Sequence, residues 1–116
     1  MITKKDIPCL RQLWQQAFGD SDAFLDKFFQ VGFSFDRCQC IRHGADIAAA
    51  LYWFDCTWNS KKVAYIYAVA TDKAHRGKGL CRRLLEDTHA HLRAMKTSGE
   101  AFMEKLEHYS IKYAIN

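Results

Sequence analysis

The chain has 116 residues, of which 49% are hydrophobic and 14% aromatic, and it carries a formal net charge of +4. A chain of this length and composition can bury a core of its own, which excludes a disordered protein and predicts a single domain over residues 1–116. No apolar run approaches the roughly 18 residues of a membrane span, and Met1–Lys5 is not followed by the hydrophobic stretch of a signal peptide. We therefore expect a cytoplasmic protein without membrane contacts.

Two amphipathic helices are predicted at the start of the chain. Asp6 is placed to cap the first helix, and Gly19 ends it. Asp20 or Ser21 is expected to cap the second helix, which stops near Gly32. Apolar residues recur at helical spacing, as Leu10, Leu13, Trp14, Ala17 and Phe18 in the first helix and as Phe24, Leu25, Phe28 and Phe29 in the second.

From Cys38 the apolar period changes to two, which predicts strands. We expect a short strand through Arg42, a long strand from Ile47 to about Thr57 and a third strand from Lys62 to Thr71. Tight turns between them predict an antiparallel meander. The third strand is apolar on both faces and is therefore expected to be central. Its two predicted faces are Val63, Tyr65, Tyr67 and Val69, and Ala64, Ile66, Ala68 and Ala70.

The last part of the chain is predicted to be helical and then extended. An apolar stripe runs along a helix from Leu80 to Lys96, and a short helix is expected over Glu100 to His108. Alternation over Tyr109 to Ile115 predicts a final strand. The predicted order is α-α-β-β-β-α-α-β, an α/β (α+β) domain with a mixed, mostly antiparallel central sheet flanked by helices.

The cysteines are odd in number and lie mostly inside predicted strands and helices. They are expected to be reduced core residues rather than disulfides. Cys38 and Cys40 share a strand face, but neither His43 nor Cys56 completes a zinc-binding pattern, so no metal site is predicted. The five are Cys9, Cys38, Cys40, Cys56 and Cys81.

A glycine-rich basic turn, Arg76–Cys81, joins the third strand to the long helix. Backbone N–H groups in such a turn converge, and the helix dipole adds positive charge, so the turn predicts an anion site suited to a pyrophosphate. It is not a P-loop, because Gly79 follows Lys78 where Ser or Thr is needed, and Arg82 replaces the third glycine of a dinucleotide fingerprint. Seven of the seventeen basic residues surround the turn: Lys73, Arg76, Lys78, Arg82, Arg83, Arg93 and Lys96.

The turn resembles the acetyl-CoA-binding motif of the GNAT superfamily of N-acetyltransferases. Arg76, Gly79 and Cys81 follow its Arg-x-x-Gly-x-Gly/Ala pattern, with Cys81 in the place of the last small residue. The resemblance covers roughly residues 1–96. It extends upstream to Asp6-Ile7-Pro8, Leu13-Trp14, Phe18-Gly19-Asp20 and Phe28-Phe29.

This resemblance implies acetyl transfer from acetyl-CoA to a primary amine of a small molecule or peptide. The third strand would pair with the pantetheine amides and the turn would hold the pyrophosphate, so the expected cofactor-binding residues are Ala68, Val69, Ala70, Arg76, Gly77, Lys78, Gly79, Leu80 and Cys81. A backbone N–H near Val69 is expected to stabilise the oxyanion.

The catalytic acid and base are less well marked in the sequence. No acidic residue lies between Val63 and Ala70, so the candidates are Tyr67 and Tyr109, with Tyr109 as the acid that protonates the thiolate. Both tyrosines also suit a plain core role. Other candidate bases are Tyr65, Glu100, Glu104 and His108.

The C-terminal part departs from the family pattern, because no apolar strand is found between Met95 and Gly99, where a fifth strand is expected. The chain is therefore interpreted as a shortened or atypical member. The main alternative to an acetyltransferase is a CoA-binding but inactive module. A third hypothesis is a small nucleic-acid-binding domain. No aromatic platform is interleaved with the basic residues, so no nucleic-acid partner is expected. An exposed edge of the cofactor strand would allow a homodimer.

Overall fold

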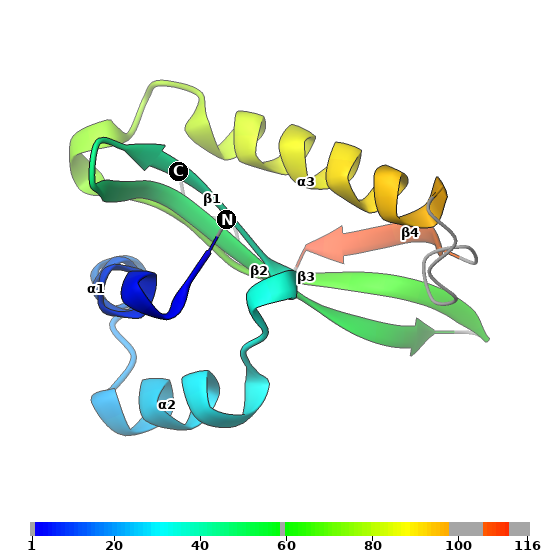
Figure 1. The fold of residues 1–116 in the computed structure, drawn as a ribbon, viewed down its shortest axis with the longest axis horizontal. Coiled ribbons are helices and arrows are strands. Elements are labelled where there is room, and N and C mark those ends of the chain that lie inside the picture. The colour runs from blue at the N-terminus through cyan, green and yellow to red at the C-terminus, as the bar shows by residue number, and fades with distance from the viewer. Residues whose placement is uncertain (1, 59, 98–105, 112–116) are drawn as a thin grey trace.

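The computed structural model describes residues 2–58, 60–97 and 106–111 (Figure 1). Its helices are α1 (Ile7–Phe18), α2 (Asp22–Lys27) and α3 (Leu80–Thr97), and its strands are β1 (Cys38–His43), β2 (Asp46–Trp58), β3 (Lys61–Thr71) and β4 (Leu106–Ile111). Short helical turns cover Lys4–Asp6, Phe28–Gly32, Phe35–Arg37 and Lys73–His75. No helix among the described residues combines the length and apolarity that a bilayer crossing requires.

The four strands form one sheet in the order β1-β2-β3-β4. The first three strands are antiparallel, as predicted, and β3 is a central strand. In contrast, β4 is parallel to β3. A parallel pair needs a crossover connection, and α3 lies within it.

Helices cover both faces of the sheet, with α1 and α2 on one face and α3 on the other (Figure 1). The α1/α2 side buries an aromatic-rich core that includes Trp14, Phe28 and Tyr52. The α3 side buries a mainly aliphatic core in which Leu84 and Leu92 of α3 pack against the sheet. The predicted mixed sheet between helices is therefore confirmed.

The first helix begins differently from the prediction. Asp6 precedes α1, but its side chain accepts no hydrogen bond from that helix. Its carboxylate instead accepts a hydrogen bond from the Thr3 N–H at 2.8 Å, because a helical turn over Lys4–Asp6 comes first. The predicted end is confirmed, since Gly19 caps α1 with φ of 70°.

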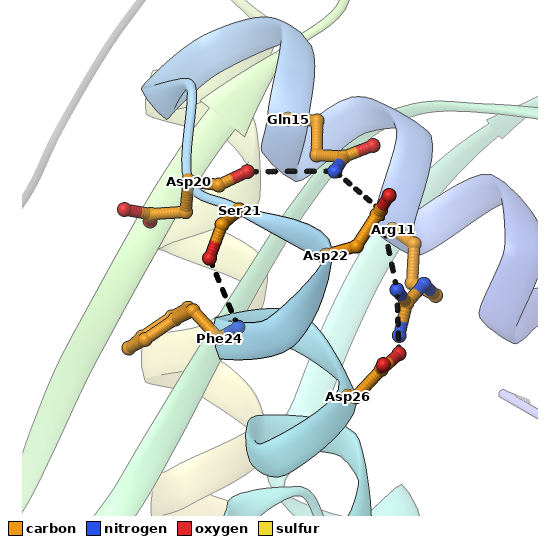
Figure 2. A network of polar contacts seen from close by, with 7 residues as sticks. All are labelled: Arg11, Gln15, Asp20, Ser21, Asp22, Phe24 and Asp26. Carbon is orange, nitrogen blue, oxygen red and sulfur yellow. Dashed lines mark hydrogen bonds and ion pairs between the residues drawn. The ribbon is translucent and has the colours of Figure 1, made fainter.

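Polar side chains connect α1 to α2 (Figure 2). The Ser21 Oγ accepts a hydrogen bond from the Phe24 N–H at 3.1 Å, so Ser21, rather than Asp20, is the N-cap of α2. Arg11 of α1 lies 2.8 Å from the Asp26 carboxylate of α2. Phe24 was expected in the core beside Leu25 but is 41% exposed, because the first turn of this short helix lies at the rim of the core.

A β-bulge interrupts β3 and corrects its predicted faces. Ala50 pairs with Ala70 and Tyr52 with Tyr67, so two residues of β3, Ala68 and Val69, face one residue of β2. The alternation therefore reverses after Tyr67. Ala68 and Ala70 join the α1/α2 core, whereas Val69 joins Ala64 and Ile66 on the α3 side.

The structure also corrects the chain after α3. The predicted helix over Glu100–His108 is wrong at its end, because Leu106 already begins β4. The described part of Met95–Gly99 holds no strand, as expected, because α3 continues to Thr97, and the strand that follows the helix in the sheet is β4, beside β3. The final strand was expected over Tyr109–Ile115, and β4 contains its first three residues. Residues 98–105 and 112–116 lie outside the described part.

Candidate functional site

The glycine-rich turn forms a loop between the end of β3 and the start of α3. Gly77 and Gly79 have φ of 80° and 75°, a region that L-residues with a side chain avoid. A Cβ added at either glycine would meet no atom within 4 Å, so the space above both residues is open. The loop is therefore accessible to a ligand that approaches the backbone closely.

The backbone N–H groups of the loop fall into two sets. Those of Ala74, His75 and Arg76 are used inside the protein: Ala74 donates to the Asp72 carboxylate at 3.0 Å, and His75 donates to the Asp72 carbonyl at 2.9 Å. Within the described residues, none of the N–H groups from Gly77 to Arg82 donates a hydrogen bond. Arg83 is the next donor, to the Gly79 carbonyl at 3.1 Å, where the helical pattern starts.

Five of these six residues, all except Lys78, line a cavity of about 380 Å³. Its lining residues come from the end of β3, the loop and the first turn of α3: Thr71, His75, Gly77, Gly79, Leu80, Cys81 and Arg82. The 18-residue helix α3 directs the positive end of its dipole here. The cavity thus combines free donors, partial positive charge and room, which is the requirement of an anion site.

The charged side chains around the cavity have different roles. The Arg76 Nε donates to the Thr71 carbonyl at 3.1 Å and ties the loop to the end of β3. Neither Arg76 nor Lys78, the two basic residues predicted to bind cofactor, lines the cavity, whereas Arg82, which was not predicted, does. Of the other predicted residues, the four from the turn line it, and Ala68, Val69 and Ala70 do not. Arg83 lies 3.8 Å from the Asp87 carboxylate one turn along α3, so its charge is partly balanced.

Cys81 contributes a neutral wall to the cavity. Burial raises the pKa of its thiol above the ordinary value of 9.0. The thiol therefore stays protonated near neutral pH and adds no negative charge beside an anion. This explains in physical terms how a cysteine can occupy a position where the motif has a glycine or alanine.

The backbone of Ala68, Val69 and Ala70 lies at the bulge of β3, and all three side chains are buried. Ala68 has φ of 55°. The pairing of β3 with β4 extends only as far as Ile66 opposite Ile111. In the described part of the chain, this stretch of β3 therefore has no neighbouring strand on the side away from β2, and its outer edge is available to an extended ligand.

The two tyrosines predicted as catalytic groups lie at different distances from the bulge along the strand direction. Tyr67 directly precedes the bulge and is half-buried, with its ring centroid 5.7 Å from that of Trp14 and 5.8 Å from that of Phe54. Tyr109 pairs with Ala64 in the backbone register, which is about 13 Å along the strand from Ala68 at ~3.3 Å per residue. The backbone thus brings Tyr67, but not the Cα of Tyr109, next to the bulge.

The remaining candidate bases give no further assignment. Tyr65 stacks on Tyr67 with ring centroids 6.3 Å apart. His108 pairs with Val63 at the far end of the β3–β4 ladder, and Glu100 and Glu104 lie outside the described residues. Among the described residues no group of three or more His, Cys, Asp or Glu side chains could hold a metal ion, and all five cysteines are free.

Sequence reasoning omitted Thr71 and left His75 without a role, although both line the cavity. The His75 ring centroid lies 4.6 Å from that of His43 in β1, so this histidine is held between the loop and the sheet. Thr71 was interpreted only as the end of a strand. A threonine at such a position carries no sequence signal that distinguishes it from an ordinary strand residue.

A comparison with protein families identifies the chain. The family model of the acetyltransferase (GNAT) domain matches residues 1–103. The chain belongs to the GNAT acetyltransferase family. The match covers the resemblance predicted over roughly residues 1–96, including α1 and α2.

Solved structures share the fold. A GCN5-related N-acetyltransferase from Kribbella flavida is 21% identical with a TM-score of 0.67, over 84% of this chain and 27% of its own. A GNAT family N-acetyltransferase from Escherichia coli, in complex with CoA, is 18% identical with a TM-score of 0.63, over 84% of this chain and 55% of its own. The chain therefore spans about a quarter of the first protein and about half of the second.

A third similar structure is an aminoglycoside acetyltransferase from an uncultured soil metagenomic sample. It is 18% identical with a TM-score of 0.61, over 97% of this chain and 74% of its own. No curated protein sequence matches the chain significantly. At these identities the structures establish the fold alone.

Proposed function

We propose that this chain is an N-acetyltransferase that binds acetyl-CoA in the cavity at the start of α3 and transfers its acetyl group to a primary amine. The observation that carries the proposal is the run of unpaired N–H groups from Gly77 to Arg82 around that cavity. A pyrophosphate supplies acceptor oxygens for these donors and negative charge for the helix dipole. A CoA-bound neighbour of the same fold supports this choice of ligand.

The pantetheine arm would lie along the open edge of β3. Its amides can pair with the backbone of Ala68 to Ala70 as an added strand would. A bulge bends a strand, and this one lies beyond the last described pair of β3 with β4. The thioester would then lie near the bulge, within reach of a backbone N–H of this stretch as an oxyanion donor.

The reaction requires a free amine. A lysine-like ammonium has a pKa near 10.4, so a proton must leave before the nitrogen attacks the thioester carbonyl carbon. A C–N bond then forms and the C–S bond breaks. The nitrogen loses two protons in all: the first passes to solvent before attack, and the second, lost as the amide forms, ends on the thiolate of CoA. Tyr67 is the proposed group for this proton transfer, because it is the tyrosine next to the bulge. Tyr109 is the second candidate.

The acceptor is proposed to be an amine of a small molecule or peptide. One neighbour of the same fold is an aminoglycoside acetyltransferase, and another is a ribosomal-protein-alanine N-acetyltransferase from Brucella melitensis. These names support an amine acceptor of either class.

Homodimerisation through an open strand edge stays a prediction, and a dimer mass in light scattering would support it.

A matched pair of glycine variants tests cofactor binding. Gly79→Ala places a side chain in the cavity wall at φ of 75°, and Gly19→Ala does the same at φ of 70° at the end of α1, outside the cavity. Each is expected to lower the free energy of unfolding by about 1 kcal/mol. Only Gly79→Ala is expected to weaken acetyl-CoA binding in isothermal titration, by tenfold or more. Absence of saturable binding by the unaltered chain would reject the proposal.

Catalysis is tested separately from binding. Tyr67→Phe is expected to lower kcat about 100-fold with little change in acetyl-CoA affinity, because a proton-transfer group contributes to the transition state alone. Its control is Tyr65→Phe, the stacked neighbour on the same strand. Release of CoA thiol in the presence of a panel of amines is the measurement. Normal cofactor binding without thiol release for any amine would favour the inactive CoA-binding module instead.

A further inference from the structure

One buried hydroxyl in the cavity has no partner. Thr71 ends β3, is only 2% exposed and lines the cavity beside the glycine turn. Its Oγ1 atom makes no hydrogen bond with any described residue. A hydroxyl removed from water without a partner is destabilising, so the position needs an explanation beyond packing.

A second buried threonine shows the usual arrangement. Thr88 of α3 is fully buried, and its Oγ1 donates to the Leu84 carbonyl at 2.8 Å. The Thr71 carbonyl, in turn, accepts a hydrogen bond from the Arg76 Nε at 3.1 Å. The backbone of Thr71 is therefore fixed by the loop, while its hydroxyl, on a residue that lines the cavity, is left without a partner among the described residues.

We propose that the Thr71 hydroxyl donates a hydrogen bond to the phosphate group held by the N–H groups of Gly77 to Arg82. The inference rests on the proposed cofactor site and adds a side-chain donor to it. A phosphate oxygen only accepts hydrogen bonds, and the cavity otherwise presents donors, so the hydroxyl has the required polarity. Thr71 is thus a ligand-contacting residue that recognises the anion rather than the pantetheine arm.

The proposal predicts opposite effects on the free and the bound protein. Thr71→Val replaces the hydroxyl with a methyl group of similar shape. The free protein loses an unsatisfied polar group, so its melting temperature is expected to rise by about 4 °C. The bound protein loses a hydrogen bond to a charged group, so the affinity for CoA is expected to fall about tenfold.

The experiment compares Thr71→Val with Thr71→Ser, which keeps the hydroxyl, and with Thr88→Val, which removes a paired hydroxyl away from the cavity. Each is titrated with CoA, inorganic pyrophosphate and pantetheine, and its melting temperature is measured without ligand. Thr71→Val is expected to weaken CoA and pyrophosphate alike and to leave pantetheine unchanged. Thr71→Ser is expected to bind like the unaltered chain, and Thr88→Val is expected to be less stable with unchanged affinities.

Equal pyrophosphate affinity of Thr71→Val and the unaltered chain would overturn the inference while the proposed function stands. A loss confined to pantetheine would overturn it as well. Failure of the unaltered chain to bind CoA would reject the proposed function itself. If Thr71→Val does not fold, Thr71→Ala and Thr71→Ser make the same comparison, because they differ only in the hydroxyl.

Discussion

Asp6 shows how one side chain can serve two structural purposes. Its carboxylate accepts hydrogen bonds from both terminal nitrogens of Arg42, at 2.9 and 2.8 Å, and another from the Thr3 N–H. The guanidinium of Arg42 and the Thr3 N–H hold the pKa of Asp6 well below its ordinary value of 3.8. The pair connects the start of the chain to β1, so it fixes the N-terminal turn against the sheet.

The Asp6–Arg42 pair predicts a specific pH dependence. Because the pKa of Asp6 is lower in the folded than in the unfolded chain, the pair stabilises fully above about pH 4 and loses its contribution as the pH falls below that value. Asp6→Asn is expected to lower the free energy of unfolding by about 2 kcal/mol at pH 7 and much less at pH 3. Denaturant titrations at both pH values measure this. The exposed control is Asp36→Asn. An equal loss of unfolding free energy at pH 7 and pH 3 for Asp6→Asn, or the same pH dependence in the control, would contradict this prediction.

At the scale of elements, the bulge of β3 is the feature that prepares the strand for a ligand. It places Ala68 at φ of 55°, a conformation that costs a residue with a Cβ about 1 kcal/mol. Such strain is retained where the surrounding structure fixes it, and it occurs often at binding sites. The bulge also moves Val69 to the α3 side, so both cores hold β3 at this point.

Two alanine variants test whether the bulge is strained. Ala68 and Ala70 are both 2% exposed and belong to the same core. Ala70→Gly is expected to lower the free energy of unfolding by about 1 kcal/mol through backbone entropy. Ala68→Gly is expected to be close to neutral, because glycine relieves the positive φ. Chemical denaturation compares the two, and an equal loss would mean that Ala68 is not strained.

The elements that could be predicted from sequence are those with local signals. Helical spacing and Gly19 define α1, and alternation with two turns defines β1, β2 and β3 nearly to the residue. The glycine turn was recognisable because its conformation requires glycine. The early start of β4 and the reversed faces after Tyr67 were not predictable, because a parallel partner and a bulge depend on contacts distant in sequence. Thr71 was missed because a threonine at the end of a strand carries no sequence signal of its own.

At the scale of the molecule, the sheet separates two cores and carries the candidate site at one end. The packing of Leu84, Thr88 and Leu92 fixes α3 on one face, which holds the first turn of that helix at the end of β3. The aromatic core under α1 and α2 supports the same strand from the other face, next to Tyr67. The site therefore depends on rigid elements on both sides of the sheet.

The central claim is that unpaired N–H groups at the start of α3 hold the pyrophosphate of CoA. The most direct test follows backbone amide signals by NMR during a titration with CoA. The largest saturable shifts are expected at Gly77 to Arg82, with further shifts at Tyr67 to Ala70 and little change along α2. Saturable binding that leaves the Gly77 to Arg82 amides unmoved would contradict the account.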